Sequence, residues 1–126
     1  MEQMLHKELS DKVLGMAFAV HNALGPGLLE SAYEGAFVVE LDYAGIKYER
    51  QCVYPLYHRG QLVSAYIADL VVDDTIIVEL KSVKELHKAM EAQIINYLRL
   101  AKLEVGYLFN FNGLRVEWRR FVIKRE

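Results

Sequence analysis

The segment from Tyr66 to Ser82, YIADLVVDDTIIVELKS, constrains the fold most, because charged residues interrupt its runs of valine, isoleucine and leucine. Near-continuous apolar runs of this length are typical of strands buried on both faces of a central sheet. Burying an ionised carboxylate is costly unless the group is paired, hydrogen-bonded or bound to a metal. Asp69, Glu79 and Lys81 therefore need partners inside the fold and are the first candidates for a functional site.

The loop between these two strands decides whether the two acids meet. Glu79 and Lys81 are two residues apart, so they share one face of their strand. A two-residue loop at Asp73-Asp74 would turn Glu79 away from Asp69, whereas a three-residue loop, 73–75, sets the two acids directly opposite each other. Asp-Asp lacks the glycine that tight type I′ turns favour, so we predict the longer loop or a bulge. Opposite carboxylates, with Cβ atoms about 4.5–5.5 Å apart, can share one divalent ion.

The alternative to a metal site is an internal ion pair. In that arrangement Lys81 neutralises one buried carboxylate and no ligand binds. The three residue types alone favour neither possibility over the other.

Hydrophobic periodicity and turn residues predict eight elements along the chain. We expect helices from Leu5 to Leu24 and from Ser31 to just before Gly45, then strands over 46–57, 62–72 and 76–81. A long helix should start at an S-x-x-E capping box, Ser82 and Glu85, and run to Ala101. Two further strands should flank the hairpin signal Asn112-Gly113. The order ααβββαββ predicts a mixed α/β fold in which helices flank a central sheet.

Composition limits the class of protein. A chain of 126 residues with 53% hydrophobic and 25% charged residues predicts one globular domain, 1–126. The single cysteine, Cys52, and the charged start without an apolar run predict a cytoplasmic protein without a disulfide or a membrane span. The net charge of −2 decides nothing about nucleic acid. A homodimer is compatible with the sequence but is not indicated by it.

Several motifs resemble one known family. VHNALGPGLLESAYEGAF contains Gly27, Glu30 and Tyr33 in a GxxExxY pattern, and AD-L followed by VELK looks like an acidic nuclease core. EAQIINYL and LFNFN are similar to later segments of the same family. The chain therefore resembles the GxxExxY proteins, which are assigned to the PD-(D/E)XK nuclease superfamily. The resemblance implies a restriction-endonuclease-like core, α-βββ-α-β, in agreement with the order read from periodicity.

The resemblance also implies roles for individual residues. Asp69 and Glu79 resemble the metal-binding acids, Lys81 the lysine of the E-x-K element, and Glu30 an additional acid from the first helices. Gln93 and Tyr97 resemble a Q-x-x-x-Y element of RecB-like nucleases.

Tyr33 is a further site candidate, through the GxxExxY motif, and the Leu80 carbonyl could complete the metal ligands because magnesium prefers oxygen. The sequence departs from the superfamily pattern at two positions before Asp69. Ala68 replaces the proline of the superfamily motif, and Ile67 stands where relatives often carry a polar or basic residue.

The function that follows is hydrolysis of phosphodiester bonds in DNA or RNA, dependent on Mg²⁺ or Mn²⁺, with nucleic acid as the partner. The alternative is a non-catalytic module that binds nucleic acid or protein and keeps only the nuclease fold.

Overall fold

The computed structural model describes residues 4–124. Its elements follow the order predicted from the sequence, ααβββαββ. The helices are α1 (Lys7–Leu24), α2 (Glu30–Ala44) and α3 (Lys88–Ala101), and the strands are β1 (Tyr48–His58), β2 (Gln61–Val72), β3 (Ile76–Lys81), β4 (Val105–Asn110) and β5 (Glu117–Val122). No helix within residues 4–124 is long and apolar enough to cross a membrane.

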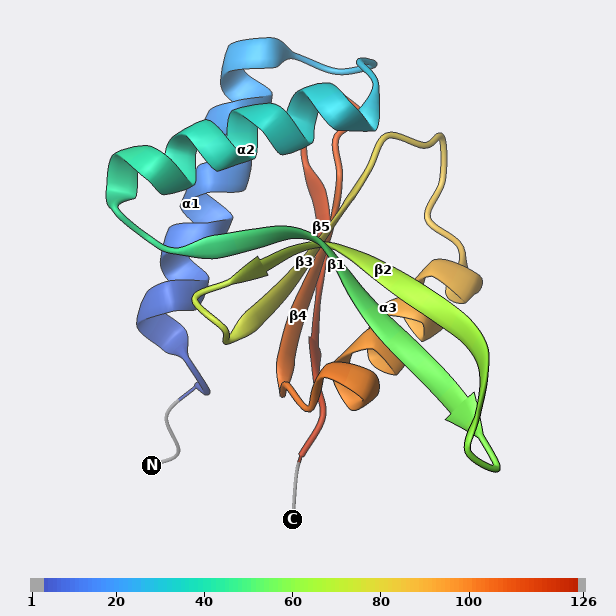
Figure 1. Cartoon of the computed structure of the whole chain (residues 1–126). Coiled ribbons are helices and arrows are strands. Elements are labelled where there is room, and N and C mark those ends of the chain that lie inside the picture. Colours follow the sequence, from blue (N-terminus) through green and yellow to red (C-terminus); the bar gives the residue numbers. More distant parts are fainter. Residues whose placement is uncertain (1–3, 125–126) are drawn as a thin grey trace.

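The five strands form one mixed sheet in the order β1-β2-β3-β4-β5. β3 and β4 are parallel and the other neighbours are antiparallel. The parallel pair needs a crossover connection, which α3 provides. Helices α1 and α2 cover one face of the sheet and α3 covers the other (Figure 1). The predicted mixed α/β fold with a central sheet between helices is confirmed.

Alternation along the central strands divides the core into two layers. On β3, Ile76, Val78 and Leu80 pack with α1 and α2, whereas Ile77 packs beneath α3. Because successive side chains of a strand point to opposite faces, Glu79 and Lys81 share the α3 face with Ile77. The predicted acidic site therefore lies between the sheet and α3.

The Gly25-Pro26-Gly27 loop joins α1 to α2 and is fixed by Tyr33. Gly25 and Gly27 have φ angles of 76° and 83°, a region that favours glycine. The buried Tyr33 hydroxyl donates a hydrogen bond to the Gly25 carbonyl (2.6 Å) and accepts one from the Leu28 N–H (3.0 Å). Its ring stacks on Phe111 at a centroid distance of 4.5 Å. Tyr33 thus ties the loop before α2 to the end of β4.

The predicted capping box at Ser82 and Glu85 is wrong. Helix α3 begins at Lys88, after a His87 cap that makes no side-chain hydrogen bond. The Ser82 hydroxyl instead donates to the Leu28 carbonyl, at 2.7 Å, before the start of α2. The Ser82 side chain is therefore engaged in a tertiary contact and does not form the local capping motif.

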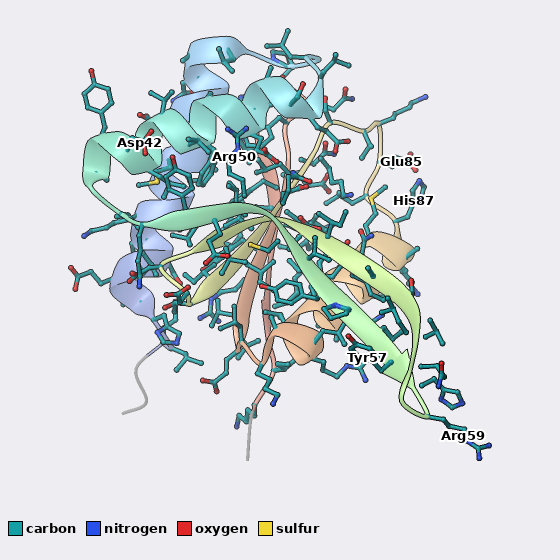
Figure 2. All side chains as sticks on the ribbon, in the orientation of Figure 1. Asp42, Arg50, Tyr57, Arg59, Glu85 and His87 are labelled. Atoms are coloured by element: carbon teal, nitrogen blue, oxygen red, sulfur yellow. The ribbon has the colours of Figure 1, made fainter. Side chains whose placement is uncertain are left out.

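Beyond the sheet, β1 and β2 continue as a two-stranded ribbon. β3 pairs with β2 only at Leu70, Val71 and Val72, whereas β1 pairs with β2 as far as His58 opposite Gln61. We call residues 52–67 the distal arm. Its tip is the two-residue turn Arg59-Gly60, in which both residues have positive φ. The arm projects past α3, with Tyr57 and Arg59 at its far end (Figures 1 and 2).

Candidate active site

The register of β2 and β3 brings Asp69 and Glu79 together. Val72 pairs with Ile76 and Leu70 with Val78, so the next position in register places Asp69 opposite Glu79. The connecting loop is the predicted three-residue one, 73–75, which confirms the register expected from the sequence. Asp73 and Asp74 both adopt left-handed backbone angles, with φ of 53° and 51°. Aspartate tolerates this region better than most residues, so the turn closes without glycine.

The two carboxylates are held by reciprocal hydrogen bonds to the opposite strand. The Asp69 N–H donates to Glu79 Oε2 at 2.8 Å, and the Leu80 N–H donates to Asp69 Oδ2 at 2.8 Å. Side-chain oxygens thus satisfy backbone donors where the direct pairing of β2 with β3 has ended. No backbone N–H within residues 4–124 donates to Asp69 Oδ1 or Glu79 Oε1, and the two carboxyl groups hydrogen-bond to each other when one of them is protonated. One oxygen of each acid therefore becomes available for a cation once the shared proton is lost.

Burial and mutual repulsion disfavour two negative charges at this point. Glu79 is only 3% exposed, and Asp69 is half-buried. Burial, followed by the negative charge of Asp69, raises the pKa of the Glu79 carboxyl from 4.5 to about 9. At neutral pH the pair therefore keeps a proton in the absence of another positive charge. A bound divalent cation would supply such a charge and remove the need for the proton.

Lys81 is placed as the sequence predicted, at the end of β3 on the same face as Glu79. It is half-buried, and within residues 4–124 its ammonium forms no ion pair and no hydrogen bond. Its charge lowers the pKa of Glu79, but less than burial and Asp69 raise it. This arrangement argues against the internal ion pair as the reason for the buried acids, and it leaves the ammonium available to a bound group.

Tyr97 on α3 lies against the acid pair. It is buried, and burial followed by the charges of Glu79 and Asp69 raises the pKa of its phenol to about 12. Its ring also meets Tyr66 edge to face, at 5.8 Å. Gln93 is half-buried one helical turn earlier on the same face of α3. Because α3 runs back from the end of β3, Gln93 lies on the Lys81 side of Tyr97.

Glu30 lies at the first position of α2 and is exposed. Within residues 4–124 no three histidine, cysteine or acidic side chains gather into a group that could hold a metal, so Glu30 does not join Asp69 and Glu79. Its ligand role remains a prediction.

One turn later on α2, Glu34 is tied to the sheet instead. It accepts hydrogen bonds from Arg50 (2.9 and 3.1 Å) and Gln51 (2.6 Å) of β1. Gln51 stands at the register position opposite Asp69, between the pairs Arg50–Leu70 and Cys52–Ala68. The sequence analysis did not single out Glu34; its spacing of four from Glu30 was the available signal.

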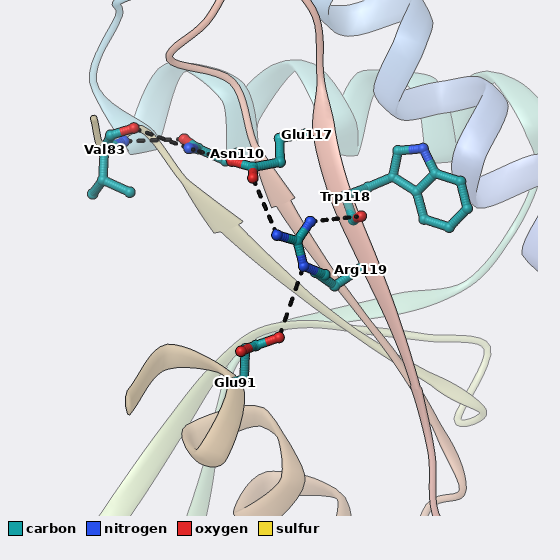
Figure 3. A network of polar contacts seen from close by, with 6 residues as sticks. All are labelled: Val83, Glu91, Asn110, Glu117, Trp118 and Arg119. Carbon is teal, nitrogen blue, oxygen red and sulfur yellow. Dashed lines mark hydrogen bonds and ion pairs between the residues drawn. The ribbon is translucent and has the colours of Figure 1, made fainter. Parts of the chain in front are cut away.

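Asn110 is a second residue that sequence reasoning missed. It pairs with Lys81 across the parallel strands, and it is 3% exposed. Its amide binds both backbone groups of Val83, accepting from the N–H at 3.1 Å and donating to the carbonyl at 2.9 Å. The amide also donates to Glu117 at 3.3 Å, within the network shown in Figure 3. Asn110 therefore fixes the chain directly after the Glu79–Lys81 segment.

The donor set fits magnesium or manganese. Magnesium is usually held by one or two carboxylates and keeps several waters, so a cage of three acids is unnecessary. Asp69 and Glu79 offer two carboxylate oxygens at one point, in a setting that disfavours uncompensated negative charge. The Leu80 carbonyl is the nearest backbone acceptor in sequence, and its role as a ligand remains a prediction.

Comparison with known proteins identifies the superfamily and a solved structure of similar fold. The family model of the PD-(D/E)XK nuclease superfamily matches residues 7–121. No curated protein matches the chain. The solved structure described as "Crystal structure of SSO0001" is similar in fold, with a TM-score of 0.58 and 19% sequence identity. The similarity covers 95% of this chain but only 60% of that one. The match over residues 7–121 shows that the chain belongs to the PD-(D/E)XK nuclease superfamily.

Proposed function

We propose that the chain is a nuclease that hydrolyses phosphodiester bonds of DNA or RNA with Mg²⁺ or Mn²⁺ as cofactor. The observation that carries this proposal is the buried pair of opposed carboxylates, Asp69 and Glu79, each with one oxygen to which no backbone N–H of the described residues donates. The proposal rests further on the family to which the chain belongs. The Lys81 ammonium, which forms no ion pair with any residue from 4 to 124, lies on the same face.

Asp69 and Glu79 would hold the metal ion. The backbone N–H groups of Leu80 and Asp69 orient the two carboxylates, so their free oxygens need little reorganisation to bind a cation. When bound, the ion supplies charge to polarise the scissile phosphate and lowers the pKa of an attacking water.

Lys81 would act on the substrate and not on the ion. Its ammonium can orient the attacking water or stabilise the negative charge that develops on the phosphoryl oxygens. Gln93 would add an amide that hydrogen-bonds to the water or to a phosphate oxygen. Tyr97 would close the site from the α3 side, where its phenol stays protonated at neutral pH because its pKa is raised to about 12.

A cleavage assay on mixed single- and double-stranded DNA and RNA tests the proposal. With Mn²⁺ or Mg²⁺ the wild type should degrade at least one of these substrates, and chelation by EDTA should stop it. Lys81→Ala should reduce the rate by roughly 100- to 1,000-fold, as the loss of one transition-state donor does. Lys84→Ala, which removes an exposed lysine three residues away, is the matched control and should leave the rate unchanged.

Lys81→Ala should also keep a manganese affinity close to that of wild type, because the ammonium does not ligate the ion. Cleavage at the wild-type rate in this variant would remove Lys81 from the mechanism. Manganese binding without cleavage of any of the four substrates would instead indicate the non-catalytic binding module.

A further inference from the structure

Gln51 has a backbone conformation that is unusual within a strand. Its φ is 51°, in the left-handed region, although it lies inside β1. The other non-glycine residues of positive φ within residues 4–124 lie in turns or at helix ends. Glutamine has no special tolerance for this region, and a residue persists there only where the surrounding structure holds it. Gln51 therefore needs a group that fixes it.

The side chains of β1 change faces at Gln51. Successive residues of a regular strand point to opposite faces, so the side chains of Arg50 and Gln51 should diverge. Instead both hydrogen-bond to Glu34 of α2. The next residue, Cys52, packs with the residues beneath α3. A sharp twist in β1 therefore coincides with the left-handed backbone of Gln51.

The neighbouring strand β2 changes faces at the residue opposite Gln51, which is Asp69. Ala68 and Val71 are three residues apart, which would place them on opposite faces of a regular strand, yet both pack beneath α3. The backbone pairing of β2 with β3 also ends at Leu70, next to Asp69. The twist thus coincides with the point where β2 leaves β3 and the Asp69 carboxylate accepts a hydrogen bond from the opposite strand.

Glu34 supplies the contacts that hold this twist. Its side chain is only 12% exposed, and it accepts hydrogen bonds from Arg50 Nε (3.1 Å), Arg50 Nη2 (2.9 Å) and Gln51 Nε2 (2.6 Å). Hydrogen bonds to an ionised carboxylate are among the stronger ones in proteins. Tyr33 and Phe37, on either side of Glu34 in α2, are fully buried. Glu34 is therefore presented to β1 from a firmly packed helix.

We propose that Glu34 is a positioning residue for the metal ligand Asp69 and acts through the twist at Gln51. By holding the left-handed backbone of Gln51, Glu34 keeps β2 turned away from β3, so that the Asp69 carboxylate lies where the Leu80 N–H orients it. The Glu34 side chain itself bonds to β1 and not to Asp69. This inference rests on the proposed metal site, since it assigns a residue that orients one of the ligands.

Two substitutions of Gln51 separate the twist from the hydrogen bond. Gln51→Val and Gln51→Gly both delete the hydrogen bond to Glu34, but only the β-branched side chain is unfavourable at positive φ. Gln51→Val should weaken Mn²⁺ binding by roughly 10- to 100-fold, as the loss of a group that orients a metal ligand does. Gln51→Gly should bind Mn²⁺ as wild type does. Isothermal titration measures both affinities.

Substitution of Glu34 gives the second test. Glu34→Ala should weaken Mn²⁺ binding to a similar extent as Gln51→Val. Adding Gln51→Gly to Glu34→Ala should restore most of the affinity, because glycine adopts positive φ without a group to hold it. Glu40→Ala is the matched control and should bind Mn²⁺ as wild type does, since Glu40 lies in the same helix but forms no ion pair within residues 4–124.

Hydrogen exchange of the Leu80 N–H, measured by NMR without metal, separates this inference from the proposed function, because this N–H donates to Asp69 Oδ2. Exchange should be faster in Gln51→Val and Glu34→Ala than in wild type, and unchanged in Gln51→Gly. If the rates differ in this way but wild type binds no Mn²⁺, the positioning of Asp69 holds and the proposed metal site fails.

Two results would overturn the inference. The first is an equal rate of Leu80 exchange in Gln51→Val and Gln51→Gly, because the backbone angle of residue 51 would then have no effect on Asp69. The second is a wild type that binds Mn²⁺ with the same affinity as Gln51→Val.

Discussion

The two halves of β2 both depart from the usual distribution of residues, in which charge is exposed and apolar side chains are buried. We call the half of β2 that pairs with β3 its root. There, Leu70 and Val72 are fully buried beside the half-buried Asp69, so charge lies inside the molecule. In the distal arm, Leu62 and Ile67 are largely exposed, so apolar surface lies outside. Each half is unfavourable for an isolated chain, and each becomes favourable when a partner of the right chemistry binds. The comparison shows that β2 buries charge where it pairs with β3 and exposes apolar surface where it does not.

The largest expected difference between the two halves is in stability. Leu70→Ala should lower the free energy of unfolding by about 2–5 kcal/mol, because it opens a cavity between the sheet and α1 and α2. Leu62→Ala makes the same chemical change in the same strand, yet it should shift the stability of the monomer by less than about 0.5 kcal/mol. Urea denaturation at low protein concentration measures both. Equal losses would show that the arm is packed as tightly as the root.

A smaller effect should appear in the pH dependence at the root. The unfolded Glu79 carboxyl loses its proton near pH 4.5, whereas the folded one keeps it until about pH 9. Between these values the folded state binds more protons, so the stability contributed by this proton declines as pH rises. In EDTA, the free energy of unfolding should fall by about 1 kcal/mol per pH unit between pH 5 and 8.

Glu79→Gln is the control for that slope, since it keeps the shape of the side chain without a titrating group. Its stability should vary much less over the same pH range. Parallel curves for wild type and Glu79→Gln would mean that Glu79 is not the group that keeps the proton.

Much of the fold was predictable from the sequence because its signals are local. Periodicity located the helices and strands, and the absence of glycine in Asp73-Asp74 favoured the three-residue loop that sets Asp69 opposite Glu79. Asp69 and Glu79 could be recognised in the sequence as candidate site residues because charged residues are rare within buried strands. The structure also places Lys81 two residues after Glu79 on the same strand, and it brings Tyr97 close enough for the charges of Glu79 and Asp69 to raise the pKa of its phenol.

The parts that were not predictable depend on contacts between distant segments. Ser82 has the sequence of a helix cap, but Leu28, 54 residues earlier, supplies its hydrogen-bond partner. Asn110 looked like an ordinary strand residue, and only its pairing with Val83 shows what it holds. The open face of the arm was also hidden, because the sequence does not say which apolar residues the chain leaves uncovered.

Thermal melting of three proteins with and without Mn²⁺ tests the central claim that the buried acids form a metal site. Asp69→Asn and Glu79→Gln keep shape and hydrogen bonds but each removes one potential charge. Without metal, neither variant should melt below wild type, because each removes a buried acid that must otherwise either take up a proton or carry a second negative charge. At 100 times the dissociation constant, Mn²⁺ should stabilise wild type by about 2.7 kcal/mol and each variant by much less. If both variants melt well below wild type without metal, and Mn²⁺ shifts none of the three, the buried acids are a structural ion pair with Lys81 and the metal-site account is wrong.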